Sequence, residues 1–397
     1  MVTAMVYAAN PPFGQEEVTA VLAVLASGQL WRGNGPGWGS LHDRTVGAVT
    51  DRLEDAVAQW LGLPYVHAVN SGTSANEAAM ASLGLEPGDE VICPAASPTF
   101  VPFAILAAGC IPVFADVDPE TLLLDPAKIE RLVSSRTRAL VVVHLWGLPA
   151  PMSDIMSVAE RSGLKVVEDC AQAFGTFING QPVGTFGDAS CYSLQQSKHI
   201  TCGEGGIFST KNSDAYMRAV LYSNAGIPNF RFGVSAPKKE HHSLGRGHLQ
   251  FGHNHRISEL QAAVALAQFS RIDQLNRRRA ELVKIIDMEL NRRKSTSLRT
   301  TRLIPDCTIS YWRYPVLVPP GRGTFLEIPY LEPVFREINS QRLTPFGAPI
   351  PGYINYDPGS CPNAEMGASQ IRAISVHHSL TDQEFLETME RSLSDLW

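Results

Sequence analysis

Short apolar runs and longer helical patterns alternate along the first half of the chain. The short runs predict strands, and they cover residues 65–69, 90–93, 112–115, 139–144 and 164–168. Between them, apolar residues recur at helical spacing over residues 74–84, 100–108, 126–134 and 154–162. Such alternation is typical of a mostly parallel sheet with helices on both faces. The pattern therefore predicts an α/β fold.

A different pattern follows in the second half of the chain. Two short strands are predicted at residues 189–194 and 206–209, and one long, nearly continuous helix over residues 257–293. Strand-like runs return at residues 310–318 and 370–375. This change indicates a smaller α+β domain at the C-terminal end.

The two patterns divide the chain into three parts. We predict an N-terminal segment with an active-site loop over residues 1–52, a large domain over residues 53–268 and a small C-terminal domain over residues 269–397. Residues 33–42 are rich in glycine but follow no strand, which favours a loop at the substrate mouth over a dinucleotide-binding motif. The Pro- and Gly-rich residues 352–363 predict a second loop on the substrate side.

The first predicted strand ends in the turn Ser71-Gly72-Thr73-Ser74, and an Ala-rich helix follows it. Gly72 lets the backbone turn tightly, which leaves the amides of Thr73, Ser74 and Ala75 at the positive end of the helix. Free amides at a helix N-terminus bind anions, so this turn is a candidate phosphate site. In the alternative interpretation, Ser71 or Thr73 is an ordinary N-cap.

Asp169 ends the apolar run that begins at Leu164, at the edge of the sheet where α/β proteins place their chemistry. An aspartate there can pair with the protonated ring nitrogen of a cofactor. It can also cap a helix or bind Mg²⁺. Gln172 would face the same side if the chain turns helically after Asp169.

Lys198 lies between a short apolar strand and a glycine turn, in the stretch that runs from Ser193 to Gly206. At the floor of a pocket, partial desolvation and nearby cations lower the pKa of a lysine and let it form an imine with an aldehyde. Ser193 could reach a phosphate from the same turn. A lysine before glycine is also compatible with an ordinary loop. Together with Asp169 and the Ser-Gly-Thr-Ser turn, Lys198 favours a pyridoxal phosphate site.

Asn254 and Arg256 directly precede the long predicted helix. The helix is most simply a packing element, because its apolar residues recur at helical spacing. The two polar residues before it could project into a neighbouring site.

These segments together resemble the DegT/DnrJ/StrS group of fold-type I aminotransferases, which make amino sugars and aminocyclitols. The resemblance spans residues 10–395 and is closest over residues 64–263. Its most specific part is the pattern Ser-x-x-x-x-Lys-x-x-x-x-Gly-Glu-Gly-Gly, which begins at Ser193. The resemblance implies a large domain with a mostly parallel mixed sheet flanked by helices, and a smaller α+β C-terminal domain.

The resemblance also implies a role for each candidate residue. Lys198 would form the Schiff base with pyridoxal 5'-phosphate, Asp169 would bind the pyridinium nitrogen, and Gln172 would touch the ring face or the phenolic oxygen.

The phosphate of the cofactor would be held by Gly72, Thr73, Ser74 and Ser193. Asn254 would reach the phosphate of the other subunit's cofactor, which implies a homodimer with shared active sites.

One position departs from the pattern of the family. Relatives place an aromatic residue shortly after the proline that corresponds to Pro94, where it stacks on the cofactor ring. Here Ala95 and Ala96 follow, and Phe100 is the nearest ring. Either Phe100 takes that role or the cofactor lacks a stacking partner.

The expected reaction is a two-step transamination. An amino acid, glutamine or glutamate, would donate its amino group, pyridoxamine phosphate would carry it, and a keto-sugar or keto-cyclitol would accept it. The products would belong to antibiotic, other secondary-metabolite or amino-sugar biosynthesis, and the Gln195-Gln196 pair favours the aminocyclitol branch. The alternatives are dehydration, decarboxylation or oxidation on the same fold, or a regulatory protein that binds the cofactor without turnover. Dehydratase relatives replace the lysine by histidine, so Lys198 favours transamination.

The composition argues against several other classes of protein. A net charge of −6 without a long Lys/Arg tract argues against a nucleic-acid or membrane partner. No apolar run approaches the ~20 residues of a membrane-spanning helix, and the N-terminus lacks the basic region of a signal peptide. The seven cysteines, an odd number, fit reduced thiols in the cytoplasm. The histidines show no zinc-ligand spacing, so we predict no metal site.

Overall fold

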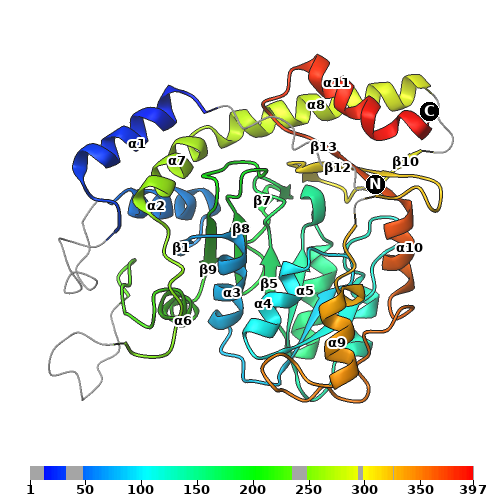
Figure 1. Ribbon diagram of the computed structural model, residues 1–397, viewed down its shortest axis with the longest axis horizontal. Coiled ribbons are helices and arrows are strands. Elements are labelled where there is room, and N and C mark those ends of the chain that lie inside the picture. Colours follow the sequence, from blue (N-terminus) through cyan, green and yellow to red (C-terminus); the bar gives the residue numbers. More distant parts are fainter. Residues whose placement is uncertain (1–12, 33–47, 235–247, 294–297, 325, 397) are drawn as a thin grey trace.

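Figure 1 shows a large central sheet and, near the C-terminal end of the chain, a smaller one. The computed structural model describes residues 13–32, 48–234, 248–293, 298–324 and 326–396. The loop predicted at residues 33–42 lies outside these ranges. Within them, no helix is both long and apolar enough to cross a membrane.

The large sheet has seven strands in the order β1-β9-β8-β5-β4-β2-β3. All neighbouring pairs are parallel except those of β9, which runs antiparallel to both β1 and β8. The prediction of a mostly parallel mixed sheet is therefore confirmed. The strands are β1 (Tyr65–Val69), β2 (Glu90–Pro94), β3 (Ile111–Ala115), β4 (Thr137–Val143), β5 (Lys165–Asp169), β8 (Ala189–Ser193) and β9 (Gly206–Thr210).

Helices flank this sheet, as the alternating pattern predicts. Helix α3 packs against α6 and against strands β8 and β9, whereas α5 packs against β5. The inner strands β2 and β4 are mostly apolar and buried, because both of their faces are covered. The flanking helices are α2 (Val49–Leu61), α3 (Gly72–Ser82), α4 (Phe100–Ala107), α5 (Met152–Ser162) and α6 (Ser213–Ser223).

The long helix predicted over residues 257–293 is in fact two helices, α7 (Glu259–Phe269) and α8 (Ile272–Arg293). The backbone tightens between them, where the amide of Arg271 donates to the carbonyl of Gln268, only three residues back. The guanidinium of Arg271 also pairs with Glu17 of α1 (Gln15–Ser27), which packs beside α7. The uniform helical periodicity on both sides conceals this break.

The smaller sheet joins β10 (Arg299–Thr300), β12 (Arg313–Leu317) and β13 (Ile371–Ser375), and we call it the C-terminal sheet. Helix α11 (Asp382–Leu393) packs against both β13 and α8. Two further helices, α9 (Pro333–Gln341) and α10 (Pro362–Gln370), complete this part. A third small sheet joins β6 (Phe177–Ile178), β7 (Gln181–Pro182) and β11 (Cys307–Thr308).

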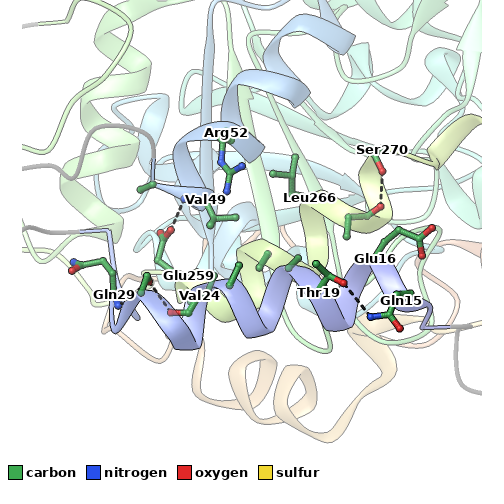
Figure 2. A pocket seen from close by; sticks show the side chains of 16 residues that line it. Gln15, Glu16, Thr19, Val24, Gln29, Val49, Arg52, Glu259, Leu266 and Ser270 are labelled. Atoms are coloured by element: carbon green, nitrogen blue, oxygen red, sulfur yellow. Dashed lines mark hydrogen bonds between the residues drawn. The ribbon is translucent and has the colours of Figure 1, made fainter.

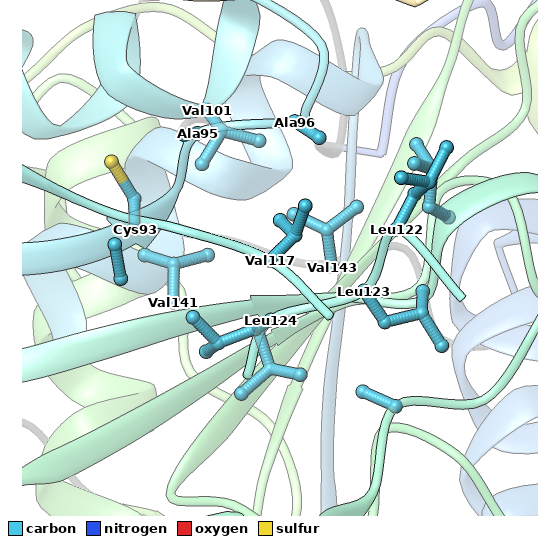
Figure 3. Packing of buried hydrophobic residues seen from close by; sticks show 14 of the residues in the cluster. Cys93, Ala95, Ala96, Val101, Val117, Leu122, Leu123, Leu124, Val141 and Val143 are labelled. Carbon is cyan, nitrogen blue, oxygen red and sulfur yellow. The ribbon is translucent and has the colours of Figure 1, made fainter. Parts of the chain in front are cut away.

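The hydrophobic core is continuous from the large sheet to the C-terminal sheet, because one cluster of buried side chains includes residues of both. Figure 3 shows part of it, where Val117, Leu122 and Leu124 lie beside Val141 and Val143 of β4. The predicted domain boundaries fall within α2 and at the end of α7. The division into domains stays a prediction.

The helix predicted over residues 126–134 is wrong. Asp125 caps a three-residue 3₁₀ turn, a second such turn follows, and Val133 is already extended. The amide of Ser134 donates to the side chain of Thr137 at 2.8 Å instead of to a helical carbonyl, so the helical turns end before it.

The first part of the stretch 352–363 does not lie on the predicted substrate side. The hydroxyl of Tyr353 donates to Glu90, the first residue of β2, and that of Tyr356 donates to the carbonyl of Pro112, near the start of β3, so this part lies at the amino ends of the strands. The stretch ends at the opposite edge, where the amide of Asn363 donates to Asp116 just after β3. Asp169, at the end of β5, also lies at that carboxyl edge.

We expect Leu124→Ala to lower the free energy of unfolding by about 2–5 kcal/mol, because Leu124 is only 1% exposed and its removal leaves a cavity in the core. Chemical denaturation of the purified variant measures this change. Leu303→Ala is the matched control, since Leu303 is 50% exposed and its truncation should change stability little. Equal losses in the two variants would contradict the assignment of Leu124 to the core.

Candidate active site

The turn that holds Lys198 is fixed by hydrogen bonds of its own residues. At the start of the turn, just after β8, the side-chain oxygen of Gln195 accepts from the amide and the hydroxyl of Ser197 at 2.8 and 2.7 Å. The amide of Lys198 donates to the carbonyl of Gln195 at 2.9 Å, and the amide of Gln196 donates to that of Gly203 at 2.9 Å. The lysine therefore leaves the backbone from a closed turn between β8 and β9.

The amine of Lys198 lies 4.0 Å from the centre of the Trp312 ring. Burial lowers its pKa to about 8, and the positive charges of Arg313 and Arg279 act in the same direction. The negative charge of Asp169 opposes them. The lowered pKa favours the neutral form of the amine, which is the nucleophilic one.

Asp169 is the last residue of β5 and is 6% exposed. One carboxylate oxygen accepts from the side-chain amide of Asn76 at 3.1 Å and the other from the backbone amide of Ala171 at 2.9 Å. Burial raises the pKa of this carboxyl group, against the effect of these hydrogen bonds and of Lys198. A cationic partner at this position would stabilise the ionised form.

The N-terminus of α3 lies directly against the end of β8. A Cβ atom on Gly72 would come within 2.7 Å of the Cβ of Ser193, so only glycine allows this approach. Ser71 is the N-cap of α3, since its hydroxyl accepts from the amide of Ser74 at 3.0 Å. The amides of Gly72 and Thr73 in the first turn have no partner within the helix. The N-cap interpretation is confirmed, and a phosphate role for this turn stays a prediction.

Gln172 is buried three residues after Asp169. Its side-chain oxygen accepts from the backbone amide of Trp146 at 2.6 Å, so its amide nitrogen is the end that remains for a ligand.

Asn254 is exposed, in contrast to the other candidate residues. It forms an isolated β-bridge with Asn224, and the next residue but one, Arg256, bridges to Val69 at the end of β1. The segment thus runs close to the N-terminus of α3 while the Asn254 side chain faces outward. Its predicted contact with a second subunit stays a prediction.

The sequence interpretation missed Trp312 and Asn76. Trp312 precedes β12, more than a hundred residues after Lys198, and its indole nitrogen donates to the carbonyl of Ser197 at 2.8 Å. Asn76 lies in the predicted helix, but no local pattern connects it with Asp169. Phe100 begins α4 and is 58% exposed, whereas Trp312 is an aromatic residue that does contact Lys198.

His144, Glu168 and Cys170 bring three potential metal ligands together behind Asp169. Their polar atoms are already engaged, because Glu168 accepts from His144 at 3.1 Å and from the backbone amides of Gly184, Phe186 and Gly187 at 2.7 Å each. Burial also raises the pKa of the Cys170 thiol, which disfavours a thiolate ligand.

A cavity of about 780 Å³ lies between α1, α2 and α7 (Figure 2). Small apolar side chains such as Ala20, Ala263 and Ala267 line much of it. None of the candidate site residues is among those that line it, so it is separate from the site around Lys198.

The geometry defines an α/β protein in which a partly buried lysine lies near a buried aspartate and a helix N-terminus. The model of the DegT/DnrJ/EryC1/StrS aminotransferase family matches residues 40–391. The chain belongs to this family and is an aminotransferase, which stands against the regulatory alternative.

The chain is similar to proteins of two substrate groups. It is 38% identical over 307 residues to the L-glutamine:2-deoxy-scyllo-inosose aminotransferase of Streptomyces fradiae, over 76% of this chain and 68% of that protein. It is 33% identical over 285 residues to the GDP-perosamine synthase of Caulobacter vibrioides, over 70% and 72% of the two chains. An aminotransferase structure from Psychrobacter cryohalolentis matches 98% of this chain and 99% of its own with a TM-score of 0.80 and 25% identity.

We expect Asp169→Asn to lower the pKa of Lys198 further below its normal value, because the variant removes the negative charge that raises this pKa. The pH dependence of acetylation at Lys198, followed by peptide mass spectrometry, measures the midpoint. Asp154→Asn, on the exposed start of α5, removes the same charge far from the amine and serves as the control. A titration midpoint of Lys198 that rises in Asp169→Asn would contradict the electrostatic effect of Asp169 described above.

Proposed function

We propose that this chain is a pyridoxal phosphate-dependent aminotransferase that moves an amino group from glutamine or glutamate to a keto-cyclitol or a keto-sugar. The observation that supports this most strongly is the Lys198 amine, whose lowered pKa leaves it partly neutral within the electrostatic reach of Asp169. The N-terminus of α3, held against Ser193, supplies an anion site next to them.

The residues present fit this cofactor. Asp169 offers a buried carboxylate for a ring nitrogen, and Gln172 offers its amide nitrogen from the same segment. The phosphate would be bound by the first turn of α3 and the end of β8, through Gly72, Thr73, Ser74 and Ser193. When bound, the cofactor supplies an electron sink for the negative charge that develops on the substrate carbon.

The side chains of the protein supply the remaining chemistry. When the cofactor is bound, the amine of Lys198 would be the group that holds its carbonyl carbon and, when free, the general base that accepts the proton from the donor's Cα. Asp169 would offer its carboxylate to the ring nitrogen and so favour the protonated form of that nitrogen. Trp312 packs against the amine and limits the volume into which it can turn.

A keto-cyclitol is the acceptor that we favour, with glutamine as the donor. The similarity to glutamine:inosose aminotransferases supports both, and the Gln195-Gln196 pair agrees with this branch. The similarity to GDP-perosamine synthases supports a nucleotide-linked keto-sugar as the second choice. Either product would enter amino-sugar, antibiotic or other secondary-metabolite biosynthesis.

We also propose a homodimer in the cytoplasm. The exposed Asn254 beside the end of β1 suits a residue that completes the partner's site. All seven cysteines are free thiols, as a reducing compartment would keep them.

We expect the purified protein with pyridoxal phosphate to show a visible absorption band that glutamine removes. Glutamate tested alone identifies the donor, and adding scyllo-inosose or a nucleotide-linked keto-sugar should restore the band only for the true acceptor. Lys198→Ala should lose the band and reduce turnover by about 10²–10⁴-fold, since it removes the attacking amine and the general base. A band that neither amino acid changes would refute transamination with these donors.

Mixing two inactive variants tests the shared site. Lys198→Ala and Asn254→Ala should each lose most activity alone, but a mixed dimer has one intact site. Random reassociation should then recover about a quarter of the wild-type activity. Activity no higher than the sum of the separate variants would show that Asn254 does not act across a dimer interface.

A further inference from the structure

Arg279 of α8 is fully buried behind the lysine turn. One of its terminal nitrogens donates to the carbonyls of Tyr311, at 3.1 Å, and of Val376. The other donates to the carbonyl of Lys198 at 3.1 Å and lies 3.4 Å from a ring nitrogen of His378. A single side chain thus joins the lysine turn to the segments that flank β12 and β13.

The positive charge of Arg279 is not balanced locally. Among the described residues, no carboxylate lies within 4 Å of its guanidinium, which distinguishes it from Arg32 and Arg231, each of which has acidic partners. Burial lowers the pKa of Arg279 to about 9, which is still above neutral pH, so the side chain keeps its charge. An unpaired buried charge destabilises a fold, and its presence beside the reactive lysine calls for a function.

The histidines around Arg279 do not share its charge. Burial lowers the pKa of His377 to about 3 and that of His378 to about 2, and Arg279 itself contributes to both shifts. The pKa of His199 is also well below its usual value, mainly through burial. At neutral pH Arg279 is therefore the cation of this cluster.

We propose that Arg279 is a positioning residue for Lys198. It fastens the carbonyl of Lys198 to the segments that flank β12 and β13, and it holds a fixed positive charge against the backbone of the lysine turn.

A second hydrogen bond works in parallel with Arg279. Trp312 follows Tyr311 directly, its indole nitrogen donates to the carbonyl of Ser197, and its ring lies against the Lys198 amine. Two consecutive carbonyls of the lysine turn are thus held by groups of the C-terminal part of the chain. The position of the lysine depends on the packing of that part.

Four charged groups face the Lys198 amine from the elements around it. Asp169 of β5 and Glu327, which precedes the short turn at Pro329–Leu331, raise the pKa of the lysine. Arg313 of β12 and Arg279 of α8 lower it. Removing Arg279 therefore shifts the balance toward the protonated amine.

The test compares Arg279→Met, Arg279→Lys and Arg278→Met in the full-length chain without added cofactor. Arg278 is the matched control, because it neighbours Arg279 on α8 but pairs at the surface with Glu281 at 3.2 Å and Asp382 at 2.7 Å. The pH dependence of acetylation at Lys198, quantified by peptide mass spectrometry, gives the titration midpoint of the amine in each variant.

In Arg279→Met we expect the midpoint to rise by a few tenths of a pH unit, which makes Lys198 about twofold less reactive at pH 7, because Arg279 contributes less than burial or Arg313. Arg278→Met should match the wild type. Arg279→Lys keeps the charge but reaches fewer carbonyls, so its midpoint should stay near that of the wild type. Bound pyridoxal phosphate should nevertheless dissociate several-fold faster from Arg279→Lys, as measured by the decay of its absorption after dilution.

An unchanged midpoint in folded Arg279→Met, checked by circular dichroism, would overturn the proposal. If that variant does not fold, the test is made on Arg279→Lys. An unchanged rate of cofactor dissociation in Arg279→Lys would show that Arg279 does not hold the lysine turn in place. The inference rests on the proposed role of Lys198, but the acetylation measurement needs no cofactor. Failure of the protein to bind pyridoxal phosphate would refute the proposed function without altering the midpoints.

Discussion

The burial of one lysine amine near one aspartate is the constraint on which the site depends. Desolvation alone disfavours the charged forms of both groups, which lowers the pKa of Lys198 and raises that of Asp169. Their mutual attraction opposes both shifts. The pKa of each group is therefore set by two opposing effects, burial and the charge of the other group.

The fold creates this balance by bringing backbone segments unusually close. Gly72 allows α3 to begin against the end of β8, and a Cβ atom on Gly206 would come within 2.1 Å of the carbonyl oxygen of Ser71. Both glycines thus serve one junction, where the strand before the lysine turn, the strand after it and the start of α3 meet. A side chain at either position would push the first turn of α3 away from Ser193 and so separate the residues of the candidate phosphate site.

The sequence predicted those candidate site residues that belong to short, local sequence patterns. Strand ends and glycine turns are short patterns, so Asp169, Lys198 and the turn at Gly72 could be predicted, as could the mostly parallel sheet. Trp312 and Arg279 could not, because each meets the lysine turn only through tertiary packing across 80 or more intervening residues. The same reason applies to residues 352–363, whose composition indicates a loop but not which edge of the sheet each part of it lies beside.

Next to each of the candidate residues Asp169 and Lys198, a buried ionisable side chain bonds to the backbone. Glu168, the residue before Asp169, accepts from three backbone amides and from His144. Arg279 donates to three backbone carbonyls, one of which belongs to Lys198. Backbone groups do not titrate near neutral pH, so these supports keep their geometry while the lysine itself gains and loses a proton. If Lys198 gains and loses a proton as proposed, the turn that carries it would keep its position, because the backbone groups that hold it do not change their charge.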